Sequence, residues 1–272
     1  MTQNRLDRLS FNQATAWNAS LPDVVEACAR HGIPYVSLWR HKIEEMGLDR
    51  AVRHVRDAGL RVSSVCRGGM FPAATAEARA QRIDDNRRAI DEAAALGAEV
   101  LVLVCGAAAD KDIAAARAQV ADGIAAVAPY AAERGVVLGI EPLHPAFAAE
   151  RSCITTLREA RTLAERFTPG VVGVVADVYH IWWDPELSEE IEASAARLVG
   201  YHVNDWLVPQ TNVLLGRGMM GDGVIELRRI RDAVERAGYA GPIEVEIFNE
   251  AVWAMPLDKL LPLVKQRFAE HV

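Results

Sequence analysis

Short apolar runs alternate with longer amphipathic segments along the whole chain. Several of these runs, such as EVLVLVCG and VGVVADVYH, are nearly continuous stretches of Val, Ile and Leu. This pattern is typical of parallel strands that are buried on both faces. We expect eight strands, which begin near residues 8, 34, 61, 99, 136, 172, 200 and 243.

The segments between these strands carry helix start and stop signals. Ser20 precedes LPDVVEACARHG, which offers an N-cap, an early proline and a stop at Gly32. Four other glycines close helical patterns just before a strand, where a left-handed residue is favoured. They are Gly59, Gly97, Gly135 and Gly238.

Eight strands, each followed by a helix, predict a closed (β/α)8 TIM barrel of the α/β class. The 272 residues suit one such barrel, so we expect a single domain over residues 1–272. An open doubly wound sheet is the alternative, although no GxGxxG motif follows the first strand.

The amino-acid composition limits the kinds of molecule that we expect this chain to bind. A formal net charge of −7 argues against a nucleic-acid backbone as the main partner, because that binding requires a surplus of Lys and Arg. The four cysteines are widely spaced and form no CxxC pair, which is typical of a reducing compartment. Neither a signal peptide nor a membrane-spanning run is evident, so we expect a cytoplasmic protein without a membrane partner.

Charged side chains stand near the carboxyl ends of four successive predicted strands. GIEPLHP contributes Glu141, VADVYH contributes Asp177, YHVND contributes His202 and EVEIF contributes Glu246. In a barrel these ends meet at one mouth, the face on which such enzymes build active sites. Three carboxylates and one imidazole suit one divalent ion such as Mn²⁺, Mg²⁺ or Co²⁺. A plain ion network is the alternative interpretation.

Further residues near this mouth are candidates for contact with a substrate. His180 follows Asp177 by three residues, and Asp205 follows His202 by three residues. Trp206 lies just past the strand that carries His202, and Arg67 ends the third predicted strand. Arg217 lies in the glycine-rich segment GRGMMGDG, which can act as a lid or as a flexible connector. A cap, an ion pair or a core position is the alternative for each of these side chains.

The motifs GIEPLHP, VADVYH, YHVND and IEVEIF, in this order, resemble those of the xylose isomerase-like barrels. That superfamily contains sugar isomerases, epimerases and dehydratases. The resemblance implies that Glu141, Asp177, His202 and Glu246 bind one metal, often Mn²⁺, and that His180 contacts the substrate. It also implies a reaction in which a base removes a proton next to a keto group while the metal stabilises the enolate.

Two branches of the superfamily remain open. In the ketose 3-epimerases the first and last ligand glutamates, here Glu141 and Glu246, exchange the protons. This chain has His144 where that branch typically has Asn, and Val208 where it usually has a substrate-binding Arg.

EPLHP, VYHIWWDP and GRGMMGDGVIEL resemble the C-glycoside deglycosidases, lyases that act on 3-oxo-C-glycosides. This resemblance implies His144 as the base and a small β-rich partner subunit. We expect a small sugar or glycoside as substrate, and an oligomer. An abasic-site endonuclease is a remote alternative, because its chemistry requires more His ligands and a basic groove. A barrel that only binds a sugar is another alternative.

Overall fold

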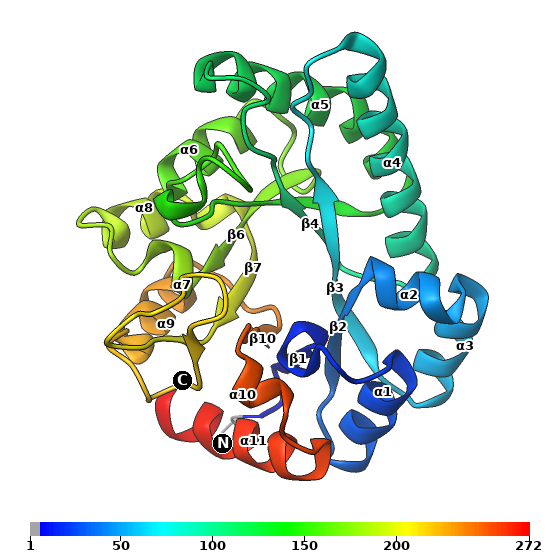
Figure 1. Ribbon diagram of the computed structural model, residues 1–272, viewed down its shortest axis with the longest axis vertical. Coiled ribbons are helices and arrows are strands. Elements are labelled where there is room, and N and C mark those ends of the chain that lie inside the picture. Colours follow the sequence, from blue (N-terminus) through cyan, green and yellow to red (C-terminus); the bar gives the residue numbers. More distant parts are fainter. Residues whose placement is uncertain (1–5) are drawn as a thin grey trace.

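The computed structural model describes residues 6–272, and its main sheet is a closed parallel barrel (Figure 1). The strand order is β1-β10-β7-β6-β5-β4-β3-β2. All eight predicted strands are present, so the predicted TIM barrel is confirmed. They are β1 (Leu9–Asn12), β2 (Tyr35–Trp39), β3 (Arg61–Gly69), β4 (Val100–Val104), β5 (Val137–Glu141), β6 (Val172–Asp177), β7 (Leu198–Val203) and β10 (Ile243–Val245).

Helices surround the barrel and connect successive strands (Figure 1). They are α1 (Leu21–Arg30), α2 (Arg40–Met46), α3 (Leu48–Asp57), α4 (Ala76–Ala95), α5 (Ile113–Arg134), α6 (Leu157–Ala164), α7 (Val178–Ile181), α8 (Leu187–Ala193), α9 (Leu227–Arg236), α10 (Glu250–Trp253) and α11 (Leu257–His271). The predicted N-cap is present at α1, where Ser20 Oγ accepts a hydrogen bond from Asp23 N. Gly32 ends this helical segment with φ of 66°.

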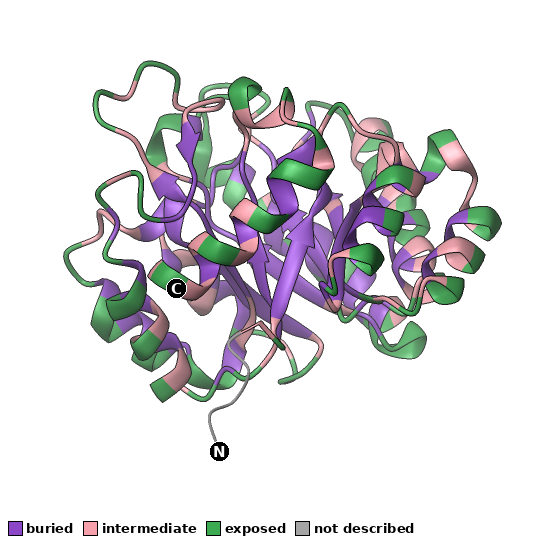
Figure 2. Cartoon of the chain, turned by 90° about the horizontal axis from the view of Figure 1, so that it is seen from below, coloured by how far each residue is buried: buried purple, intermediate pink, exposed green. Residues whose placement is uncertain are grey.

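The core lies between the barrel and the inward faces of the helices (Figure 2). Alternate side chains of each strand point into the barrel or toward the helices, and both sets are buried, which explains the continuous apolar runs. Leu101 and Val102 of β4 are examples, since they point to opposite faces and both are buried. The ring of helices closes where α11 lies beside α1, with an ion pair of 3.0 Å between Arg30 and Asp258.

The parallel arrangement brings the strand-end charges to one mouth. Glu141 and Asp177 are the last residues of β5 and β6, and Glu246 directly follows β10. Asp177 pairs in register with His202, which pairs on its other side with Glu244. The topology therefore places these side chains on four adjacent strands.

A second, two-stranded antiparallel sheet was not predicted. It pairs β8 (Asp205–Trp206) with β9 (Arg217–Gly218), and it ties down both ends of the intervening loop. Met219 and Met220 are buried directly after it. The glycine-rich segment is thus packed against the barrel, and it is neither an open lid nor a loose connector in this structure.

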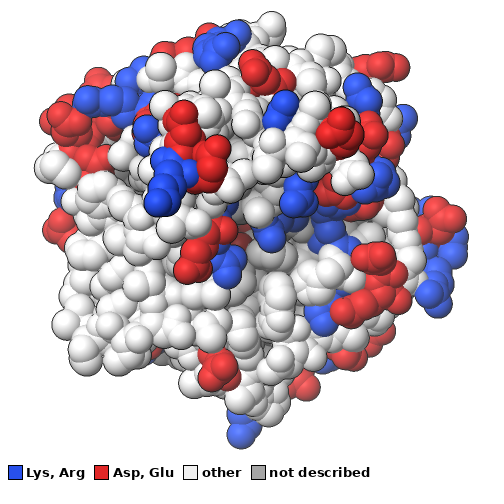
Figure 3. All heavy atoms as spheres, turned by 45° about the horizontal axis from the view of Figure 1, so that its top comes forward, with Lys and Arg blue, Asp and Glu red and all other residues white. Residues whose placement is uncertain are grey.

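Among the described residues, none of the helices has the length and apolar character needed to cross a membrane. Acidic and basic side chains are interspersed over most of the face drawn in Figure 3, and they are sparse over its lower left part. That face shows no continuous basic groove. The prediction that no signal peptide is present rests partly on residues 1–5, which lie outside the described residues.

Candidate active site

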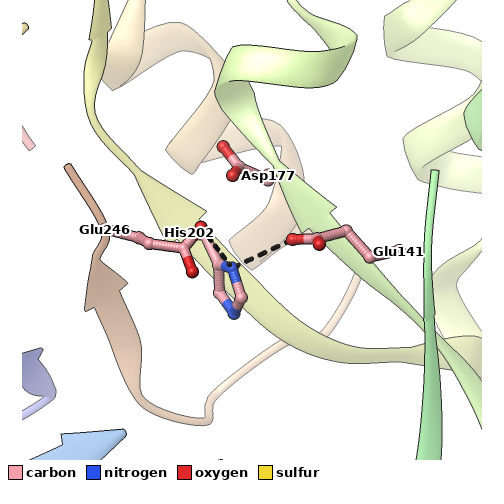
Figure 4. A group of neighbouring side chains, drawn as sticks. All are labelled: Glu141, Asp177, His202 and Glu246. Carbon is pink, nitrogen blue, oxygen red and sulfur yellow. Dashed lines mark ion pairs between the residues drawn. The ribbon is translucent and has the colours of Figure 1, made fainter. Parts of the chain in front are cut away.

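Four buried side chains converge at the carboxyl-terminal mouth of the barrel. Glu141, Asp177, His202 and Glu246 each offer one ligand atom, and these atoms lie within 4.8 Å of one another. His202 Nδ1 lies 3.3 Å from Glu141 Oε1 and 3.8 Å from Glu246 Oε2. The two glutamates approach the imidazole from opposite sides (Figure 4). The strand-end residues singled out in the sequence therefore share one site.

The donor atoms of this cluster fit a divalent metal ion. Glu141 Oε1 and both ring nitrogens of His202 are buried and make no hydrogen bond. Such atoms are costly unless something pairs with them. Without a cation, closely packed carboxylates cannot all stay ionised, and burial together with Glu141 raises the pKa of Glu246 to about 8. Three carboxylates and one imidazole match the ligand preference of Mn²⁺, Mg²⁺ or Co²⁺.

His202 is oriented by a carboxylate behind it. Its Nε2 lies 3.3 Å from Glu244 Oε2, so its Nδ1 faces the cluster. Glu244 is held by Ser63 Oγ at 2.8 Å and by Asn12 Nδ2 at 3.2 Å. A carboxylate beside the outer ring nitrogen helps to orient a metal-binding imidazole.

The carboxylates around His202 also set its protonation. Burial opposes the charged form, but Glu244 and Glu141 raise the pKa of His202 to about 10. The protonated ring then supplies a positive charge at the point where the carboxylates converge. A metal ion binds the neutral ring, so it would displace this proton and take over its electrostatic role.

Arg217 lies inside the cluster. Its Nη1 donates to Asp177 Oδ2 at 2.6 Å and to Glu246 Oε2 at 3.0 Å, and its Nη2 lies 3.1 Å from His180 Nε2. Although burial opposes ionisation, Arg217 and His180 lower the pKa of Asp177 to about 2. In this structure β9 and the carboxylates hold Arg217 in place, and its contact with a substrate stays a prediction.

A cavity of about 50 Å³, partly open to solvent, lies over the cluster. Five of the predicted residues line it: Arg67, Glu141, His180, Arg217 and Glu246. The remaining lining side chains are Trp39, Cys66, Val102, Val104, Leu143, Phe147, Arg151, Leu214 and Phe248. Most of these are apolar, so the cavity combines one polar floor with largely apolar walls.

His144 does not line this cavity. Its Nδ1 accepts a hydrogen bond from Ala146 N at 3.2 Å, and its backbone N–H donates to His180 Nδ1 at 3.1 Å. Its ring packs 5.0 Å from the Trp206 ring and 5.8 Å from the Trp183 ring. Burial lowers the pKa of His144, so the ring is neutral near pH 7. The expected orientation toward the metal ligands is therefore not found.

Asp205 and Trp206 also lie outside the cavity lining. Asp205 is buried and accepts hydrogen bonds from the backbone N–H groups of Trp206, Gly221 and Ile225. It therefore organises the segment that follows β8. Trp206 packs against Tyr179, with ring centroids 4.7 Å apart. Both side chains serve the loop scaffold in this structure, and their contact with a substrate stays a prediction.

The sequence interpretation missed several cavity residues. Trp39 ends β2 and Phe248 follows Glu246 by two positions, so a search of every strand end would have found both. Phe147, Arg151 and Leu214 come from long loops. Nothing in their local pattern indicates the cavity, because the tertiary path of the loop decides where they point.

Comparisons with known proteins now bear on this site. A family model described as xylose isomerase-like TIM barrel matches residues 25–265. A 3-dehydroshikimate dehydratase of Pseudomonas aeruginosa is 27% identical over 254 residues, which are 88% of this chain and 38% of that protein. This chain thus spans well under half the length of that dehydratase.

In two further comparisons the match covers most of this chain and most of the other protein. L-ribulose-5-phosphate 3-epimerase UlaE of Escherichia coli O1:K1 / APEC is 25% identical over 231 residues, which are 80% of this chain and 76% of the epimerase. The crystal structure of protein SMc04130 from Sinorhizobium meliloti 1021 is similar at a TM-score of 0.95. That protein shares 46% sequence identity, and the match covers 98% of each chain.

Proposed function

Because the chain belongs to the xylose isomerase-like TIM barrel family, we propose that it is a divalent-metal-dependent enzyme of the sugar isomerase and epimerase type. It removes a proton next to a keto group of a small sugar-derived substrate. The observation that carries this proposal is the buried cluster of four ligand atoms beneath a cavity at the carboxyl-terminal mouth of the barrel. The named relatives, a dehydratase and an epimerase, support an enzymatic role.

Glu141, Asp177, His202 and Glu246 would hold the ion, with Mn²⁺ as the proposed occupant and Mg²⁺ or Co²⁺ as alternatives. When bound, the ion supplies a Lewis acid that withdraws electron density from a carbonyl oxygen and so acidifies the neighbouring C–H. Arg217 pairs with both Asp177 and Glu246 and so offsets the repulsion between these two carboxylates.

Glu141 and Glu246 are the proposed proton-transfer residues. Both line the cavity, and they approach from opposite sides of His202. Their strands, β5 and β10, are separated in the barrel by β6 and β7. One carboxylate can therefore take a proton from one face of a substrate while the other returns a proton to the opposite face, as epimerisation requires.

His180 is the proposed contact for a substrate hydroxyl. It lines the cavity and lies between Arg217 Nη2 and the backbone N–H of His144. Burial lowers the pKa of His180 to about 3, so the ring stays neutral during catalysis. Because both ring nitrogens already have neighbours, a substrate hydroxyl would take the place of Arg217 at Nε2, where a neutral imidazole can donate or accept one hydrogen bond.

A C-glycoside deglycosidase is the second candidate. The aromatic lining by Trp39, Phe147 and Phe248 favours it, because these rings suit an aromatic aglycone. That activity was predicted to use His144 as the base, and the ring of His144 packs against Trp206 outside the lining. The small β-rich partner subunit, the oligomer and the cytoplasmic location stay predictions.

The test of the proposal is a substrate screen in D₂O with added Mn²⁺. Ketohexoses, an inosose, 3-dehydroshikimate and 3-oxo-C-glycosides are incubated with the enzyme, and products are identified by NMR and mass spectrometry. We expect deuterium at the carbon next to the keto group, or an elimination product. Turnover without solvent exchange at that carbon would contradict the proposal, and an abasic-site duplex tests the nuclease alternative.

Matched variants assign the chemistry to the cluster. Glu246→Gln should lower turnover by about 10²–10⁴-fold, the usual effect of losing a general acid or base. Glu133→Gln is the control, because this exposed carboxylate lies on α5 away from the cavity. A fully active Glu246→Gln variant would reject the assigned proton-transfer role.

A further inference from the structure

Two arginines line the cavity together with Glu141 and Glu246. Arg67 lies on β3, and Arg151 lies in the loop between β5 and α6. Within residues 6–272, no Asp or Glu forms an ion pair with either guanidinium. Arg217, by contrast, is paired with two carboxylates at the cavity floor.

The other charges of the site do not compensate the positive charges of Arg67 and Arg151. The three carboxylates of the cluster are neutralised by one divalent ion together with Arg217. Arg67 and Arg151 then face the same cavity with like charge. The backbone O of Arg151 accepts a hydrogen bond from Gly106 N just beyond β4, and β4 pairs with β3, which carries Arg67, so the two segments are neighbours at the cavity. Such a pair is unfavourable unless an anion joins it.

The walls of the cavity place this pair apart from the keto end. Val104 of β4 pairs in register with Gly69 of β3 on one side and with Glu141 of β5 on the other. Apolar side chains of β4 thus separate the strand that carries Arg67 from the first metal-ligand residue. Arg151 also lies over the Phe147 ring, 5.8 Å from its centroid, and this contact limits the freedom of the guanidinium.

We propose that Arg67 and Arg151 form an anion-binding subsite, so that the substrate carries a carboxylate or a phosphate group at the end remote from its keto group. This inference rests on the proposed function for the position of the keto end. Arginine forks recognise both anions with paired N–H donors, so the shared chemistry is a planar or tetrahedral oxyanion. A neutral sugar would leave the two cations unpaired inside the cavity.

Isothermal titration calorimetry of the full chain tests the subsite without requiring turnover. Inorganic phosphate, benzoate and neutral benzyl alcohol are the probes, and each is titrated into protein before and after treatment with EDTA. We expect one anion to bind per chain, and to bind after EDTA treatment as well, because the arginines are not metal ligands. Tighter binding of phosphate indicates a phosphate ester, and tighter binding of benzoate indicates a carboxylate.

Variants decide whether the arginines are responsible. Arg67→Gln and Arg151→Gln should each weaken anion binding about tenfold or more, as expected for the loss of a charged hydrogen-bond donor. Arg166→Gln, at an exposed position after α6, is the control and should bind like the parent chain. Arg67→Lys keeps the charge and should retain part of the affinity, which separates a lost contact from a misfolded chain.

Three results would overturn the subsite: no anion binding to the parent chain, binding that EDTA abolishes, or binding that the Arg67 and Arg151 variants leave unchanged. Melting temperatures of all variants show whether each one is folded. A failed exchange experiment in D₂O would reject the proposed function and leave the calorimetric result standing. A failed titration would reject the subsite and leave the proton-transfer chemistry standing.

Discussion

Replacement of Glu244 by Gln tests how the structure prepares His202 for a metal. Glu244 is not a member of the ligand cluster, but its Oε2 lies 3.3 Å from His202 Nε2. Gln keeps the shape of the side chain, and Ser63 Oγ and Asn12 Nδ2 remain as neighbours. The substitution therefore removes a negative charge from behind the imidazole and leaves the packing in place.

The expected effect is a weaker metal site. Loss of an outer carboxylate partner typically lowers metal affinity about 10–100-fold, which corresponds to about 1.4–2.8 kcal/mol. Competition with a chelator of known affinity measures the dissociation constant for Mn²⁺. The matched control is Glu99→Gln, since Glu99 lines the same hollow as Glu244 and, within the described residues, forms no ion pair with His202. An unchanged Mn²⁺ affinity in Glu244→Gln would refute the orienting role of Glu244.

Three further results are expected. Mn²⁺ at 100 times its dissociation constant should stabilise the folded chain by about 2.7 kcal/mol, and calorimetric melting with and without EDTA measures this shift. His144→Ala should change ketose turnover less than about threefold, because its ring lies outside the cavity; a loss of about 10²-fold or more would return the base role to His144. Although burial opposes it, Arg161 and Arg158 lower the pKa of Glu190. Glu190→Gln should therefore lower the free energy of unfolding by about 1–2 kcal/mol at pH 7. Because the folded pKa is the lower one, this difference should shrink below about pH 4, as urea denaturation at several pH values can show.

The ligand cluster could be predicted because its residues belong to buried strands. An apolar run that ends in Glu141 or Asp177 fixes both the strand and the end at which the charge lies. Parallel pairing then brings these ends together without any knowledge of loop paths. The eight strands were predictable for the same reason, since double burial leaves a continuous apolar pattern.

The rest of the site depends on loops, and there the sequence was less informative. The glycines around Arg217 left a lid and a flexible connector both open, whereas the short pairing of β8 with β9 places Arg217 against Asp177. His144 follows a ligand strand by only three residues, yet its ring turns toward Trp206 because its Nδ1 caps the turn at Ala146. Such local hydrogen bonds compete with any functional orientation, and a linear pattern does not reveal which one prevails.

The most direct test of the account is the stoichiometry of metal binding. EDTA-treated protein is titrated with Mn²⁺ and followed by electron paramagnetic resonance, for the parent chain and for the Asp177→Asn and His202→Ala variants. The account predicts one tight site per chain that both substitutions weaken severely, while melting curves show that the variants remain folded. A parent chain that binds no Mn²⁺, Mg²⁺ or Co²⁺, or a His202→Ala variant that binds Mn²⁺ as tightly as the parent, would contradict it.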